Sequence, residues 1–252
     1  FVIQGGSFHA MEYYTRTIVG SQVGEFWGYE SDGIFQSQDE IDALTYEDDN
    51  GVTQLTYGSN VGPGDYRYVD RNKDGQLNEE DKVKIGSPYP DFTMGITGDI
   101  SYKGFDFNLF MYWSYGNEIF NTVKVFTETP YEQTNMSSYM LTDAWRPDNP
   151  NATIAQLGGD RQNNYSRSSD RFIEDGSFLR FKNISLGYTI PENVSRKVNI
   201  EKLRFYVALQ NYFTITKYSG RDPELGSTWG VFVQKADLGN YTIPKTLNFG
   251  IN

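Results

Sequence analysis

The sequence predicts an all-β protein that forms part of the wall of an antiparallel transmembrane β-barrel. Apolar and polar residues alternate along several stretches, as they do in strands with two different faces. Short turns join these stretches in pairs, and long polar segments separate the pairs. A membrane-crossing strand needs about 9–11 residues, whereas the strands of a soluble β-sandwich typically have about 5–6. The sandwich, whose strands also alternate, is the alternative that strand length disfavours.

The clearest hairpin is predicted over residues 92–115. Two alternating arms, 92–102 and 105–115, flank Lys103-Gly104, and a two-residue turn containing glycine is a strong hairpin signal. One face of the second arm is apolar and ends in aromatic residues: Phe105, Phe107, Leu109, Met111, Trp113 and Tyr115. The other face carries Asp106, Asn108, Phe110, Tyr112 and Ser114. This hairpin fits a wall with one face toward lipid and the other toward water.

A second hairpin is predicted from residues 184–190 and 203–213, joined by a short turn. Pro191 ends its first arm because proline has no N–H to donate to a neighbouring strand. A last strand is predicted over 246–252, where apolar residues again alternate with polar ones.

Three long polar stretches, 36–65, 127–177 and 218–241, are predicted to be loops on one side of the barrel. Six aromatic residues near strand ends suit a membrane girdle: Trp27, Tyr29, Trp113, Tyr115, Tyr188 and Tyr218. Five others in the loops suit a surface that stacks on a ligand: Tyr131, Tyr139, Trp145, Tyr165 and Trp229.

The composition excludes several classes of protein. The chain has no cysteine, which excludes disulfide scaffolds, thiol nucleophiles and cysteine-ligated metals. A net charge of −11 disfavours nucleic-acid binding, which needs clustered Lys and Arg. No apolar run is long enough for a spanning helix. His9, the single histidine, gives little support for a catalytic triad, and acidic neighbours such as Glu174-Asp175 give little for a glycosidase, so no enzyme is expected.

Residues 70–81 match the calcium-loop pattern D-x-[DN]-x-[DN]-G-x5-E except at the last position, where Asp81 replaces Glu. Side chains at the first, third and fifth positions can converge on one cation, and Gly75 permits the sharp turn. The predicted ligands, with Gln76 through its backbone carbonyl, are Asp70, Asn72, Asp74, Gln76, Asn78 and Asp81. The flanks look strand-like, which favours a lone structural Ca²⁺ loop over a paired sensor. The alternative is a solvated Asx-rich turn without an ion.

The two ends of the chain read as strands cut in mid-alternation, so a piece of a longer protein is expected. Conspicuous sequence blocks occur at 24–35, 64–92, 170–188 and 210–224, the last ending in Asp222-Pro223-Glu224. These blocks, in this order, resemble the C-terminal part of SusC/RagA-type TonB-linked outer-membrane transporters of Bacteroidota.

The resemblance implies that residues 1–252 form roughly the last third of a 22-stranded, plugged barrel with long extracellular loops. The N-terminal plug would lie outside this chain. It also implies import of glycans or oligopeptides across the outer membrane, energised by the TonB complex and assisted by a SusD-like surface lipoprotein. The other candidates are a soluble, calcium-stiffened glycan-binding module and a glycosidase.

Overall fold

The computed structural model describes residues 2–6, 11–130, 135–160, 162–226 and 230–252. The chain divides into two compact units. Unit 1 comprises Phe1–Pro88, Ile119–Glu174 and Leu225–Gly239, and unit 2 comprises Tyr89–Glu118, Asp175–Glu224 and Asn240–Asn252. His9, Tyr131 and Trp229, which the sequence analysis singles out, lie outside the described residues.

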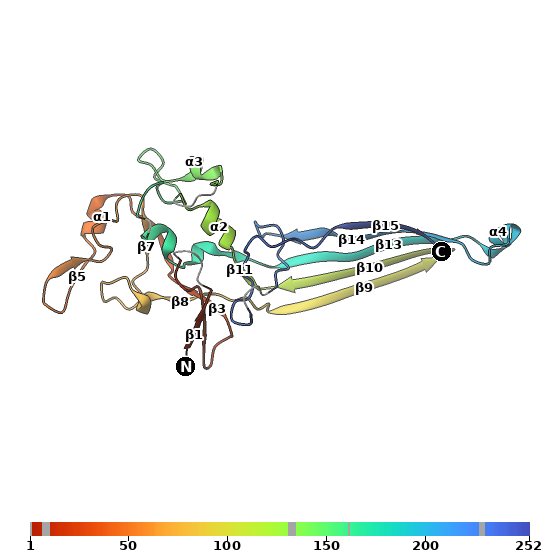
Figure 1. Cartoon of the computed structure of the whole chain (residues 1–252), viewed down its shortest axis with the longest axis horizontal. Coiled ribbons are helices and arrows are strands. Elements are labelled where there is room, and N and C mark those ends of the chain that lie inside the picture. The colour runs from red at the N-terminus through yellow and green to blue at the C-terminus, as the bar shows by residue number, and fades with distance from the viewer. Residues whose placement is uncertain (1, 7–10, 131–134, 161, 227–229) are drawn as a thin grey trace. The chain divides into compact units, whose positions relative to one another are not determined.

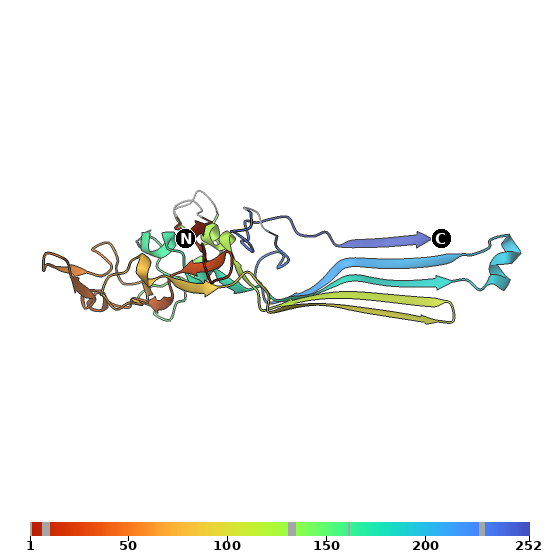
Figure 2. The ribbon, with the colours of Figure 1, turned by 90° about the horizontal axis from the view of Figure 1, so that it is seen from below.

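Unit 2 is an antiparallel sheet of five strands (Figure 1, Figure 2). Its order is β15-β14-β13-β10-β9, and every neighbouring pair is antiparallel. The strands are β9 (Phe92–Tyr102), β10 (Phe105–Tyr115), β13 (Phe178–Thr189), β14 (Arg204–Thr216) and β15 (Thr246–Ile251). The first predicted hairpin is confirmed residue for residue, and the all-β fold class is confirmed with it.

The turn between β9 and β10 follows from its two residues. Lys103 has φ 47° and Gly104 has φ 86°, and positive values at both central positions match the right-handed twist of a hairpin. A Cβ on Gly104 would lie 2.7 Å from the carbonyl oxygen of Thr189. Glycine is therefore required there for its backbone conformation and for space.

The second hairpin differs from its prediction in both arms and in the connection between them. Strand β14 ends at Thr216, three positions after the predicted end at residue 213. Strand β13 begins at Phe178, six positions before the predicted start at residue 184. The connection to β14 contains α4 (Glu192–Ser195) and a 3-10 turn (Arg196–Val198), so it is not a short turn. Pro191 caps α4, where its fixed φ is compatible with a helix start.

Unit 1 is built from short strands and single helical turns. Its main sheet has the order β1-β2-β3-β8: β1 (Val2–Gly5), β2 (Thr15–Ile18), β3 (Glu25–Gly28) and β8 (Val83–Gly86). Two small two-stranded sheets pair β4 (Ser31–Ile34) with β7 (Tyr66–Tyr68) and β5 (Thr45–Glu47) with β6 (Thr53–Leu55). Strand β11 (Glu118–Phe120) pairs with β12 (Ile173–Asp175).

The helices are all short: α1 (Gln38–Asp42), α2 (Thr122–Thr127) and α3 (Tyr139–Asp143), with 3-10 turns at Glu79–Asp81 and Asp170–Phe172 and a π turn at Gln162–Ser166. Over the residues that the structure describes, no helix has the length and apolar character needed to cross a bilayer.

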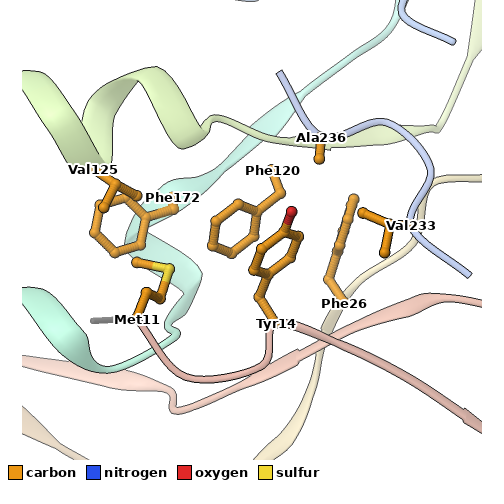
Figure 3. Packing of buried hydrophobic residues seen from close by; sticks show 8 residues of the cluster. All are labelled: Met11, Tyr14, Phe26, Phe120, Val125, Phe172, Val233 and Ala236. Atoms are coloured by element: carbon orange, nitrogen blue, oxygen red, sulfur yellow. The ribbon is translucent and has the colours of Figure 1, made fainter. Parts of the chain in front are cut away.

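An aromatic core holds unit 1 together (Figure 3). Phe120 stacks on Tyr14 with ring centroids 4.2 Å apart and also packs near Phe26 and Phe172. Val233 joins the same cluster from a segment far along the chain. The stretches predicted as long loops are thus largely folded, because they contribute buried residues to this core and to smaller clusters.

The structure also corrects the interpretation of several aromatic residues. Tyr29 and Tyr218 are buried, so neither can belong to a membrane girdle. Trp145 and Tyr165 are buried as well, and the indole N–H of Trp145 donates to Gln36 Oε1, so neither presents a free stacking face. Tyr139 is partly exposed, with its hydroxyl donating to Glu128 at 2.7 Å.

Candidate functional site

One face of the five-stranded sheet is apolar across all of its strands. The register places Phe107 of β10 between Ile100 of β9 and Leu186 of β13, followed by Val207 and Phe249 on β14 and β15. Ile100 is 65% exposed and Phe249 77% exposed. A continuous apolar surface of this kind costs free energy in water, which makes it a candidate interaction surface. We call it the apolar face.

A bulge in β13 keeps the apolar residues on this face along the whole strand. Asn183 pairs with Phe110, and Phe181 pairs with the next residue, Met111, so Lys182 is the extra residue. The extra residue shifts the alternation along β13 by one position. The apolar residues before the bulge and those after it therefore lie on the same face of the sheet.

The opposite face, here called the polar face, carries side chains that bond from strand to strand. The Asn183 amide donates to Asn108 Oδ1 at 2.6 Å, and the Asn108 amide donates to Asp99 Oδ1 at 2.7 Å. Nearer the turn end of the strands, Arg204 donates to both carboxylate oxygens of Asp106 at 2.9 and 2.5 Å. These bonds stiffen a polar wall over β9, β10, β13 and β14.

Gly187 makes the ion pair between Arg204 and Asp106 possible. These two residues belong to β14 and β10, on either side of β13, and the guanidinium must cross β13 to reach the carboxylate. A Cβ at residue 187 would lie 2.4 Å from the Arg204 guanidinium and 2.6 Å from Asp106 Oδ1. Glycine therefore provides the space through which the guanidinium reaches across β13.

A buried charge cluster ties the segment after β14 to the polar face. Arg180 is 3% exposed and donates to Asp222 at 2.5 Å and to Glu224 at 2.8 Å. Lys182 bonds both carboxylate oxygens of Glu224 at 2.7 Å. Asp222 also accepts the backbone N–H of Ile243. The two cations and two carboxylates balance, which makes their burial tolerable.

The stabilisation that this charge cluster provides is expected to depend on pH in the acidic range. Burial alone raises the pKa of Asp222, but hydrogen bonds from Arg180 and from the N–H of Glu224 outweigh it and hold the pKa below the ordinary 3.8. A depressed carboxylate pKa means that the stabilisation is complete above the ordinary value and is lost as pH falls through the folded pKa.

We therefore expect the amide of Ile243 to stay protected from hydrogen exchange at about pH 5 and to lose protection at a pH well below the ordinary pKa of 3.8. Hydrogen exchange corrected for the intrinsic rate measures this, with the amide of Leu209 in β14 as the internal control. Asp222→Asn should remove the pH dependence. Equal protection of the Ile243 amide at both pH values would contradict the role given to Asp222.

The predicted ion loop closes on itself through its own side chains. Asp70 accepts the N–H groups of Lys73 and Gly75 at 2.7 and 2.8 Å. Asp81 is buried and accepts the N–H groups of Arg71 and Asn78, both at 2.8 Å. The first and last predicted ligands thus lie at the base of one closed loop.

The middle ligands are engaged in the same way. Asn72 accepts the N–H of Asp74 at 3.0 Å, Asp74 that of Gln76 at 2.7 Å, and Asn78 that of Glu80 at 2.8 Å. The bond from Gln76 lowers the pKa of Asp74, which keeps its carboxylate charged.

The donors of this loop are all oxygens, which is the donor chemistry that Ca²⁺ prefers. Their arrangement does not form a ready metal site, because no group of three acidic side chains placed to hold a metal occurs among the described residues. The turn is instead stabilised by Asx hydrogen bonds and by Thr56, which donates to the Gly75 carbonyl at 2.5 Å. The flanking strands β7 and β8 are as predicted.

Sequence reasoning missed the charge cluster and Gly187. A signal was present, since Arg180 and Lys182 are the charged residues of an otherwise uncharged strand, and a charge inside such a strand needs a partner. The sequence does not show which carboxylate pairs with Arg180, because Asp222 lies 42 positions after it.

No protein-family model matches the chain. Among curated proteins, it is 32% identical to "TonB-dependent receptor P3" of Formosa agariphila over 253 residues, which is 97% of this chain and 23% of that protein. It is 34% identical to "TonB-dependent receptor SusC" of Bacteroides thetaiotaomicron over 178 residues, which is 70% of this chain and 17% of that protein. The chain therefore spans about a quarter or less of the length of these relatives.

Among solved structures, the RagAB peptide transporter superposes with a TM-score of 0.67 at 23% identity, covering 94% of this chain and 23% of that one. The RagAB peptide importer in its "open-open" state superposes with a TM-score of 0.65 at 24% identity. At these identities the likeness concerns the fold. None of these proteins is named as an enzyme, which agrees with the expectation from the composition.

Proposed function

This chain belongs to the TonB-dependent receptors of the SusC/RagA type, and on that premise we propose that the full-length protein imports large nutrients across the outer membrane. The nutrients would be glycans or oligopeptides. Residues 1–252 would form the C-terminal part of a barrel whose plug lies elsewhere in the protein. Proteins of this family are outer-membrane receptors, so we propose the same location for this one.

The observation that carries the proposal is the difference between the two faces of the sheet. The strands β9, β10, β13 and β14 have 11, 11, 12 and 13 residues, enough for a tilted crossing of about 9–11 residues. The apolar face would lie against lipid and the polar face against the lumen. In a closed barrel the edges of β9 and β15 would pair with strands of the same protein outside this chain.

We further propose two partners. Energy would come from the inner-membrane TonB complex, which would act on the plug. A SusD-like surface lipoprotein would bind the nutrient together with the long loops. A soluble glycan-binding module is disfavoured by the exposed apolar face, which spans all five strands.

Membrane fractionation of the full-length native protein tests the proposal, followed by mass spectrometry of the proteins that it retains. We expect recovery in the outer membrane together with a SusD-like lipoprotein, and uptake of the nutrient that stops when TonB is deleted. Recovery as a soluble protein without a partner would contradict it.

The ion loop is a second part of the proposal. We propose that Ca²⁺ binds residues 70–81 and stiffens the loop on the extracellular side. Arg71 and Lys73 are exposed, so trypsin can cleave the full-length receptor there. We expect about 1 mM Ca²⁺ to slow cleavage at these two sites about tenfold relative to EDTA, because an ion restrains the backbone.

Asp74→Ala should remove the effect of Ca²⁺ on cleavage, whereas Asp39→Ala, an exposed carboxylate on α1, should preserve it. Identical cleavage rates with Ca²⁺ and with EDTA in the unaltered receptor would mean that the loop is a self-sufficient Asx turn.

A further inference from the structure

Phe110 is out of place on the polar face. It lies on β10 between Asn108 and Tyr112, pairs with Thr97 of β9 and with Asn183 of β13, and is 37% exposed. A large apolar side chain that stays exposed among polar neighbours loses the free energy it would gain by burial. Its exposed part is therefore available for a contact outside the described residues.

The ring of Phe110 rests on a glycine. A Cβ built on Gly95 of β9 would lie 3.4 Å from Phe110 Cε2 and 4.0 Å from Cζ, so the end of the ring is in van der Waals contact with that position. With no side chain at residue 95, the end of the ring can approach the backbone of β9. The ring as a whole stays 37% exposed, so part of it is accessible from the space in front of the polar face.

Other aromatic residues on the polar face have side-chain partners. Tyr112 lies 5.8 Å from the Phe178 ring, measured between centroids, and Phe178 is buried. The Arg204 guanidinium lies 5.0 Å from the Tyr206 ring. Across the described part of the chain, no ring–ring or ring–cation contact involves Phe110. Among the described residues, Phe110 is thus an aromatic side chain of the polar face that is partly exposed and makes no contact with another ring or with a cation.

The charges around Phe110 restrict what can bind there. Asn108 and Asn183 flank the ring, and Asn108 donates onward to the carboxylate of Asp99. The cationic side chains in these five strands, Arg180, Lys182 and Arg204, are all in ion pairs. An anionic ligand would find no free cation on the strands, whereas hydroxyl groups can both donate to a carboxylate and accept from an amide.

We propose that Phe110 is a stacking platform for a sugar ring, with Asn108, Asn183 and Asp99 beside it as hydrogen-bonding groups for sugar hydroxyls. A sugar ring combines an apolar C–H face with neutral hydroxyl groups at its edge, which matches a flat aromatic face bordered by amides and a carboxylate. The proposal rests on the import function proposed above and selects the glycan branch of it.

The test uses the full-length receptor with its lipoprotein partner in detergent. An array of oligosaccharides and an array of oligopeptides matched in length serve as probes. We expect oligosaccharide binding, which Phe110→Ala weakens about 5- to 10-fold, because one aromatic stacking contact is lost. Phe110→Trp should keep the affinity within about twofold, while Phe110→Leu, which preserves bulk without a flat face, should behave like Phe110→Ala.

Three outcomes would overturn the inference. Binding of peptides only, or of neither array, would exclude a sugar site. Equal affinity of the Phe110→Leu variant and the unaltered receptor would show that the ring only fills space. A loss of thermal stability in Phe110→Ala with unchanged oligosaccharide affinity would mean that the ring packs against another part of the receptor. The import function fails separately, if cells with the unaltered receptor show no TonB-dependent uptake.

Discussion

Ile96→Arg should prevent the receptor from assembling in the outer membrane, whereas Thr97→Arg should leave assembly intact. The two residues are neighbours on β9, so their side chains lie on different faces of the sheet. Ile96 pairs with Met111 on the apolar face, and Thr97 pairs with Phe110 on the polar face. An arginine on the lipid side near the middle of the bilayer costs about 2–4 kcal/mol, whereas a lumen position remains hydrated.

The measurement is the fraction of full-length receptor found folded in outer-membrane extracts, followed by urea unfolding of the folded material in lipid vesicles. Both variants introduce arginine at adjacent positions of β9, so the two variants are matched in the strand propensity and the length of the new side chain. Equal tolerance of both variants would mean that the apolar face does not contact lipid.

The second large effect is expected in the core of unit 1. Phe120→Ala should lower the free energy of unfolding by about 3–5 kcal/mol, because the cavity would remove the stacking on Tyr14 and the packing against Phe26 and Phe172. Phe232→Ala is the matched control, since that phenylalanine is 38% exposed. It should cost well under half as much.

Denaturant unfolding of the full-length receptor, followed by hydrogen exchange of amides in unit 1, measures the difference. A similar small effect of both substitutions would show that the cluster of Figure 3 does not form a cooperative core.

The first hairpin could be predicted residue for residue because both of its determinants are local. Period-two alternation defines the two arms, and Lys103-Gly104 supplies two residues that tolerate positive φ. The start of β13 could not be predicted, because the alternation changes phase at the bulge residue Lys182. A phase change resembles a strand end when only the sequence is read, and the partner strand that resolves it is distant in the chain.

The folding of unit 1 was also beyond the sequence pattern. Its core joins Tyr14, Phe120 and Val233, which are separated by about a hundred residues each and lie in segments without a clear period. By contrast, the hydrogen bonds inside residues 70–81 follow from local Asx chemistry, so the shape of the loop could be predicted. The partners of Arg180 depend on the fold, so they could not be predicted from the sequence.

The membrane wall is tested most directly at the two faces of β10. This chain has no cysteine, so single cysteines can be placed at successive positions from 106 to 113 of the full-length receptor and labelled with a nitroxide. In lipid vesicles, we expect high oxygen collision rates at the odd positions and high collision rates with a water-soluble nickel complex at the even ones. Equal access of the nickel complex to odd and even positions would contradict a membrane wall.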